Sequence, residues 1–217
     1  MSEVIDLYFS FRSPYSYLST FGHRGIARDF EVAFNLKPVL PTAVREPDKM
    51  STENPNFGRY IIIDSARRAE FLGLPYAMPD PDPVVQDMQT FVTAKDQPLL
   101  HWVLALAVEA NRQGRGLDFA SEVSKMIFGG TKGWNAPDKM EAAANRAGLS
   151  LAQMEAAIAV GDHADEVRRN YADLQAAGHW GVPTMVLRGE PFFGQDRVDL
   201  FRWRLKKLGI PLRNPDL

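Results

Sequence analysis

Apolar and polar positions alternate in two short segments that flank one helical stretch. Residues 4–10 (VIDLYFS) are short, β-branched and aromatic, which predicts a strand. Ser13 then offers an N-cap hydroxyl and Pro14 the fixed φ of a first helical position, so a helix is expected to about Arg28. Residues 31–39 (EVAFNLKPV) alternate again and predict a second strand. The three segments together predict a β-α-β unit with parallel strands.

From Pro38 to about Gly178 the pattern changes to helical spacing and loops. Residues 98–114 (PLLHWVLALAVEANRQG) and 151–178 carry apolar side chains at helical spacing, with glycine near their ends. A proline-rich segment at 74–83 (LPYAMPDPDP) interrupts this block, and its acidic positions are interpreted as a solvated turn rather than an acid/base pair. Because β-branched runs are few, the block is expected to be entirely helical.

The β pattern returns after the helical block. Residues 182–194 (VPTMVLRGEPFFG) are interpreted as two short strands around a turn at 188–191, which makes a hairpin. Residues 196–209 then predict a helix that ends at Gly209. One face of this helix carries four apolar side chains: Val198, Phe201, Leu205 and Leu208. The predicted order is therefore β-α-β, a helical block, and β-β-α.

Composition narrows the classes of partner. The chain has 217 residues, 45% of them apolar, and a net charge of -2, so no strong field steers it to nucleic acid or an anionic membrane. The apolar run at 102–108 is far shorter than the roughly 20 residues of a membrane span. The acidic start MSEVIDLYF lacks the basic region of a secretory signal, and a cytoplasmic location is expected. The better default partner is a small ligand.

Cysteine is absent, and this changes the interpretation of the motif at residues 13–16, Ser-Pro-Tyr-Ser. Its spacing is that of a redox dithiol, Cys-Pro-Tyr-Cys, with oxygen in place of both sulfurs. A serine hydroxyl carries no redox couple, but it donates a hydrogen bond, and a helix start favours an anion by roughly 0.3 to 1 kcal/mol. Ser13 is therefore predicted to stabilise a thiolate that a ligand supplies; the alternative is that Ser13 only caps its helix. The four histidines show no ligand spacing, so no metal site is expected.

A second motif, Gly-Val-Pro-Thr at residues 181–184, stands where a third strand is predicted. By itself it is also compatible with an ordinary strand start. The two motifs together resemble the thioredoxin superfamily with a helical insertion. Within it, the chain is most similar to the kappa-class glutathione transferases and the 2-hydroxychromene-2-carboxylate isomerases. The segments that carry this resemblance are residues 9–18 (FSFRSPYSYL), Asn54-Pro55, 59–79 and 179–201.

The resemblance implies a fold and its division into domains. It implies a thioredoxin-like α/β domain formed by residues 1–40 and 179–217, interrupted by an all-α insertion at residues 41–178. The peptide bond before Pro183 would be cis and would face Ser13, and a cleft between the two parts would hold the ligand.

The resemblance also implies glutathione as the ligand that brings the thiol. Its contacts would be with Ser13, Pro14, Tyr15, Asn54, Val182, Pro183, Gln195 and Asp196. The backbone of Val182 would pair with the cysteinyl unit, and Asp196 would suit the ammonium group of the γ-glutamyl end. Asp196 has a second interpretation as an N-terminal residue of the last helix.

Arg12, Arg59, Tyr60 and Trp180 are the candidates for the substrate side. Arg12 stands where the family commonly has an apolar residue; it would lie near the thiolate, pair with a substrate carboxylate, or be solvated. Arg59 would replace a lysine that the family usually has after Asn-Pro. Aromatic side chains at Tyr60 and Trp180, with Phe57 and Trp134, would line a pocket or fill the core.

The activity that the resemblance implies is a glutathione-dependent isomerisation of the 2-hydroxychromene-2-carboxylate type. The thiolate would add to a conjugated carbon of an aromatic-degradation intermediate, allow rotation, and leave. Catalysis is assigned to Ser13, and relatives of this kind imply a homodimer. Two alternatives stay open at this point: a kappa-like transferase or peroxidase, and a non-catalytic thioredoxin-like binding module.

Overall fold

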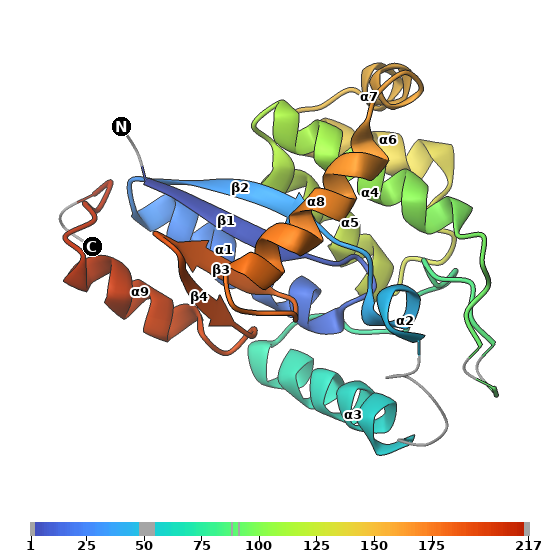
Figure 1. The fold of residues 1–217 in the computed structure, drawn as a ribbon, viewed down its shortest axis with the longest axis horizontal. Helices are drawn as coiled ribbons and strands as arrows, with labels where there is room; N and C mark the ends of the chain where they lie inside the picture. Colours follow the sequence, from blue (N-terminus) through green and yellow to red (C-terminus); the bar gives the residue numbers. More distant parts are fainter. Residues whose placement is uncertain (1–2, 48–54, 88, 91, 215–217) are drawn as a thin grey trace.

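Four strands form one mixed sheet at the centre of the molecule (Figure 1). The computed structural model describes residues 3–47, 55–87, 89–90 and 92–214. The strands are β1 (Glu3–Phe9), β2 (Val32–Pro38), β3 (Thr184–Leu187) and β4 (Glu190–Phe193), in the spatial order β2-β1-β3-β4. β1 is parallel to β2 and antiparallel to β3, and β3 is antiparallel to β4. The predicted β-α-β and β-β-α units are confirmed.

Helix α1 (Pro14–Asp29) connects the two parallel strands, and its bounds match the prediction to within one residue. Ser13 is the N-cap and Pro14 the first helical residue, as the sequence indicates. Leu18 and Ile26 are buried in the core. The start of α1 is therefore fixed by local chemistry, and its length by the apolar positions that pack inward.

The hairpin turn is shorter than predicted. Only Arg188 and Gly189 lie outside the strands, with φ of 51° and 79°, whereas Glu190 and Pro191 belong to β4. A two-residue turn with positive φ at both positions matches the right-handed twist of its flanking strands. Glycine adopts this conformation at little cost, and Arg188 is the described non-glycine residue that shares it.

Helix α9 (Val198–Lys207) packs on the sheet through the predicted face, with Phe201 and Leu205 fully buried. Its first residue lies against α1, because a Cβ built on Gly22 would come within 2.6 Å of the Val198 side chain. Glycine at this position of α1 thus permits the two helices to approach closely.

Seven helices occupy the described part of the segment between β2 and β3. They are α2 (Thr42–Arg45), α3 (Pro55–Leu72), α4 (Pro98–Arg112), α5 (Gly116–Phe128), α6 (Pro137–Arg146), α7 (Leu151–Ile158) and α8 (His163–Ala176). The helical stretch at 151–178 is divided into α7 and α8. Between them, a side chain at Gly161 would collide with the His163 ring at 2.2 Å, so this tight turn requires glycine. None of the helices in the described ranges is both long and apolar enough to cross a bilayer.

Side chains from α4 and α8 cover the outer edge of β2. The backbone N-H of Leu36 donates to Asn111 Oδ1 at 2.7 Å, and Asn111 Nδ2 donates to Asn35 Oδ1 at 2.7 Å. Asn170 Nδ2 donates to the carbonyl of Pro38 at 3.0 Å. Side-chain amides thus pair groups that would otherwise be exposed at a sheet edge. One continuous hydrophobic core contains buried residues of the sheet and of α4 to α7, so the helical block packs directly on the sheet.

Candidate functional site

Strand register brings the two sequence motifs to the same end of the sheet. Tyr8 pairs with Thr184, so Pro183 lies beside the end of β1, from which residues 10–13 lead into α1. The backbone N-H of Ser13 donates to the Ser10 carbonyl at 3.1 Å and closes this turn. The Val182–Pro183 peptide bond is cis, as predicted.

The hydroxyl of Ser13 can donate a hydrogen bond to a ligand. Its oxygen accepts a hydrogen bond from the Ser16 amide at 3.2 Å, which caps α1. In the described part of the chain, its hydrogen has no acceptor. Ser16, by contrast, is fully buried, and its Oγ accepts from the Ser10 amide at 3.4 Å. The second serine of the motif is thus a structural residue, and Ser13 is the one that can donate to a ligand.

One backbone amide at the start of α1 is also available to a ligand. The first amides of a helix have no acceptor within the helix. Pro14 has no amide hydrogen, and that of Ser16 is bound to Ser13, which leaves the amide of Tyr15 unpaired among the described residues. The first turn of α1 carries no acidic side chain. The helix start therefore presents two donors and the positive end of a helix dipole to an anion.

The phenol of Tyr15 is committed to the protein itself. Its hydroxyl donates to Asp64 Oδ2 at 2.7 Å, and the Tyr60 hydroxyl donates to the other oxygen of Asp64 at 3.4 Å. Burial raises the pKa of Tyr15, and the bond to Asp64 adds to this effect. The side chain thus ties α1 to α3, and only the backbone amide of Tyr15 can bind a ligand.

Arg12 is not solvated; its side chain is 13% exposed. Its Nε and Nη2 each lie 3.0 Å from a carboxylate oxygen of Asp82, and Nη2 donates to Gln86 Oε1 at 2.8 Å. The interpretation of Asp82 as part of a solvated turn is therefore wrong, because the loop between α3 and α4 folds back onto Arg12. Asp82 balances the charge of Arg12, so Arg12 anchors the turn before Ser13. A contact of Arg12 with a substrate carboxylate stays a prediction.

The loop between β4 and α9 contacts the cis-proline segment. The amide of Gly194 donates to the Pro183 carbonyl at 2.9 Å, and Gln195 Oε1 accepts from Arg68 Nε at 2.6 Å. Asp196 forms an ion pair with Arg197. Arg197 is the N-cap of α9 and no side chain caps that helix, so Asp196 does not have the capping role.

The remaining candidates are spread over the surface and the core. Arg59 and Tyr60 are exposed on α3. Trp180 is also exposed and stacks on the His179 ring at 4.5 Å. Trp134 is fully buried and donates to the Pro81 carbonyl at 2.8 Å, so it belongs to the core. The predicted contact at Asn54 lies outside the described residues.

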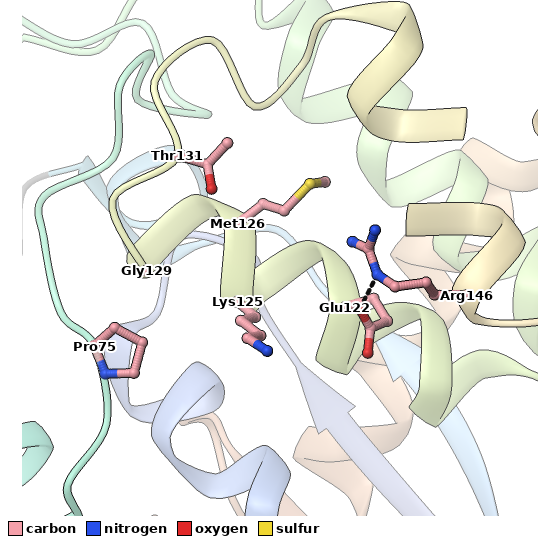
Figure 2. A pocket seen from close by; sticks show the side chains of 7 residues that line it. All are labelled: Pro75, Glu122, Lys125, Met126, Gly129, Thr131 and Arg146. Carbon is pink, nitrogen blue, oxygen red and sulfur yellow. Dashed lines mark hydrogen bonds and ion pairs between the residues drawn. The ribbon is translucent and has the colours of Figure 1, made fainter. Parts of the chain in front are cut away.

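Two hollows in the described structure lie away from these residues. One, of about 210 Å³, is lined by side chains of α5 and α6 and by Pro75; Figure 2 shows the Glu122–Arg146 ion pair (2.6 Å) on its wall. The other, of about 360 Å³, lies beside Asn111 and Asn170 at the β2 edge. Neither is lined by Ser13, so a ligand cleft at the motif stays a prediction. No group of three or more His, Asp or Glu side chains in the described ranges is placed to hold a metal ion.

Sequence reasoning missed Asp64, Arg68 and Asp82. Asp64 and Arg68 are four residues apart on α3, on the same face as the buried Ser65 and Ala69. Charged and polar side chains occur all along α3 and most of its large apolar side chains are exposed, so nothing in its sequence marks Asp64 and Arg68 as site residues. Nothing near Asp82 in the sequence indicates its partner either, because Arg12 is far away in the chain.

A family model for DSBA-like thioredoxin domains matches residues 4–206. The chain belongs to this family. The match includes the helical block, so the family has both the sheet and the helices inserted in it. No curated protein sequence matches the chain.

Three solved structures share the fold of this chain at low sequence identity. A 2-hydroxychromene-2-carboxylate isomerase is 17% identical with a TM-score of 0.66, over 94% of this chain and 95% of the other. A probable DsbA oxidoreductase from Streptomyces coelicolor is 18% identical with a TM-score of 0.62, over 98% and 93%. The cytosolic disulfide reductase DsbM from Pseudomonas aeruginosa, solved with GSH, is 11% identical with a TM-score of 0.58, over 94% and 98%.

Proposed function

We propose that the protein is a glutathione-dependent isomerase of the 2-hydroxychromene-2-carboxylate type. The observation that carries the proposal is Ser13, whose hydroxyl caps α1 through its oxygen and keeps its hydrogen free among the described residues. With no cysteine in the chain, the dithiol chemistry of the oxidoreductases in this family has no sulfur here. A site that binds an anion at this place fits a thiolate brought by a ligand.

Bound glutathione would supply a sulfur that adds reversibly to a conjugated carbon of an aromatic-degradation intermediate. The part of the protein is to hold that sulfur ionised. A free thiol with a pKa of about 8.5 is only a few percent ionised at pH 7, and a drop of about 2 units, roughly 2.7 kcal/mol, makes it mostly thiolate. Ser13 Oγ-H and the Tyr15 amide are the two donors, and charge-assisted bonds of this kind are the strong ones.

Residues around the cis proline would orient the tripeptide. The backbone of Val182 would pair with the cysteinyl unit, and Gln195 and Asp196 would hold the γ-glutamyl end. These roles come from the family resemblance. The contact of Gly194 with Pro183 supports them, because it keeps the loop next to the segment that would carry the ligand.

The proposal is tested by assaying aromatic-degradation intermediates and other electrophiles with and without glutathione, while total free glutathione is measured. An isomerase requires glutathione and leaves its concentration unchanged. A kappa-like transferase or peroxidase, which would use the same thiolate, consumes glutathione. Absence of any turnover together with absence of glutathione binding would leave a non-catalytic binding module.

A pH titration of the complex tests the chemical step directly. The ultraviolet absorbance of the thiolate is expected to develop at lower pH in the bound tripeptide than in free glutathione. A titration that coincides with that of free glutathione contradicts the proposed role of Ser13. The cytoplasmic location and the homodimer stay predictions, to be checked by cell fractionation and light scattering.

A further inference from the structure

Arg68 extends from α3 toward the loop between β4 and α9. It is half-buried, and its Nε donates to Gln195 Oε1 at 2.6 Å. The guanidinium carbon lies 5.0 Å from the centre of the Phe71 ring, one helical turn further on. Arg68 therefore lies beside the residue that the proposed function places at the γ-glutamyl end of glutathione.

The charge of Arg68 is not balanced by the protein. Among the described residues no carboxylate lies within ion-pair distance of it, although Arg12 pairs with Asp82 and the neighbouring Arg67 lies 3.6 Å from Asp64. A guanidinium has five N-H donors in a fixed fork that fits a carboxylate. Among the described residues, only Nε of Arg68 has a hydrogen-bond acceptor. A partly buried guanidinium without a counter-ion is unfavourable, so the binding of an anionic ligand group at Arg68 would be favourable.

The residue that is bonded to Arg68 has a carboxylate as its neighbour in the loop. Gln195 is followed directly by Asp196, whose exposed side chain is paired with the equally exposed Arg197 and is open to a ligand ammonium. Arg68 and Asp196 thus offer a cation and an anion that are both next to Gln195. This pair of charges matches an α-amino acid group, in which the carboxylate and the ammonium are attached to one carbon. Arg59, the cation expected from the sequence, is exposed, and no hydrogen bond or ion pair between described residues joins it to this loop.

We propose that Arg68 binds the α-carboxylate of the γ-glutamyl group, with Gln195 holding the guanidinium in place and Asp196 taking the ammonium. This inference rests on the proposed use of glutathione. Arg68 would bind the γ-glutamyl end of the tripeptide, away from the thiol. Its substitution therefore changes the affinity for glutathione, whereas the ionisation of the sulfur depends on Ser13.

The test compares three ligands by titration calorimetry: glutathione, 4-aminobutyryl-cysteinyl-glycine, which lacks the γ-glutamyl carboxylate, and glutaryl-cysteinyl-glycine, which lacks its ammonium. We expect Arg68→Gln to weaken glutathione binding about 10- to 100-fold, the range for losing a hydrogen-bonded charge partner. The analogue without the carboxylate should bind the wild type and Arg68→Gln equally. The matched control is Arg67→Gln, which removes the exposed arginine next to Arg68 and should leave the affinity for all three ligands unchanged.

The outcomes separate this inference from the proposed function. If Arg68→Gln weakens all three ligands to the same extent, Arg68 only ties α3 to the loop and the inference is overturned. Unchanged glutathione affinity in a folded Arg68→Gln also overturns it, while leaving the proposed function intact. If the wild type binds no glutathione, both fall. Should Arg68→Gln not fold, the wild type alone decides, since it must bind the analogue without the carboxylate 10- to 100-fold more weakly than glutathione.

Discussion

Helices α1 and α7 begin in the same way but in different surroundings. Each follows a serine in extended conformation whose Oγ accepts a bond from the amide three residues later, at 3.2 Å for Ser13 and 3.4 Å for Ser150. Ser13 lies at the sheet end shared with the cis-proline segment and follows the anchored Arg12. Ser150 caps a short surface helix, and its cap bond is exposed to solvent.

The comparison shows that a capping bond is no sign of function. In both places it uses a lone pair of the serine oxygen, and neither hydroxyl hydrogen has an acceptor in the part of the chain that the structure describes. The difference lies in the position in the fold: Ser13 follows β1 at the sheet end where the cis proline lies, and the loop after β4 is hydrogen-bonded to that proline. The same local device is structural at α7 and, in our proposal, also chemical at α1.

The largest expected effect that separates the two helix starts is on turnover. Ser13→Ala should lower turnover by about 10- to 1000-fold, because it removes one preorganised donor to an anion, worth roughly 1.4 to 4 kcal/mol. It should also raise the pKa of the bound thiol, which is followed by ultraviolet absorbance. Ser150→Ala is the matched control and should leave both unchanged. Equal turnover in the two variants would break the comparison.

Asp196 offers the next largest effect, on affinity. Asp196→Asn should weaken glutathione binding by up to about 3 kcal/mol, the upper range for a hydrogen bond to a charged group. Asp199→Asn is the control, since Asp199 carries a similar exposed charge in the first turn of α9. If the two substitutions change affinity equally in titration calorimetry, only the general charge of the loop matters and Asp196 has no specific contact.

The interior of α1 differs from that of α7 by a buried histidine. His23 is 1% exposed, its Nδ1 has no partner among the described residues, and burial lowers its pKa to about 3. The unfolded chain binds a proton near pH 6.5 and the folded protein does not, so stability falls as the pH drops below 6.5. The slope approaches about 1.4 kcal/mol per pH unit below pH 6.5, and the loss between pH 6.5 and 5 amounts to roughly 1.6 kcal/mol.

Urea unfolding at these two pH values measures this loss. His23→Leu should reduce it by about 1.6 kcal/mol, because no histidine is then left in α1 that must lose its proton on folding. His101→Leu, which removes an exposed histidine, serves as the control for losing an imidazole. A pH dependence that survives His23→Leu would show that another group is responsible.

The smallest expected effect is on the free energy of unfolding, and it should be the same at the two helix starts. Ser13→Ala and Ser150→Ala should each lower the free energy of unfolding by about 1 kcal/mol, the typical value of an N-cap side chain. Urea unfolding of both variants tests this. A much larger loss at Ser13 alone would indicate that its substitution disturbs the neighbouring turn, and the change in turnover would then need a structural explanation.

Local signals were enough to predict most of the fold. Ser13 and Pro14 mark the start of α1, and the period of apolar residues through Phe201 and Leu205 marks the buried face of α9. The hairpin was predicted, but its turn was two residues too long, because the positive φ of Arg188 has no sequence signal beyond the adjacent glycine. These features depend on neighbours in the chain, which is why a sequence shows them.

The contacts that organise the site depend on distant residues and could not be predicted. Arg12 lies next to Asp82, and Arg68 next to Gln195, through folding of the whole chain. No periodicity records such a pairing. Arg12 could be identified as unusual from the sequence, but whether it faced solvent, a ligand or a carboxylate was decided by where the loop before α4 runs.

The pairing of Tyr8 with Thr184 has a consequence for how the protein is made. On a ribosome, β1 and β2 can pair early, but one edge of β1 has no partner until β3 has been synthesised. Closing such a long loop slows folding, and an unpaired strand edge promotes aggregation. We expect nascent chains released before β3 to depend on chaperones, and the ligand site, which needs β3 and the loop after β4, to be assembled last.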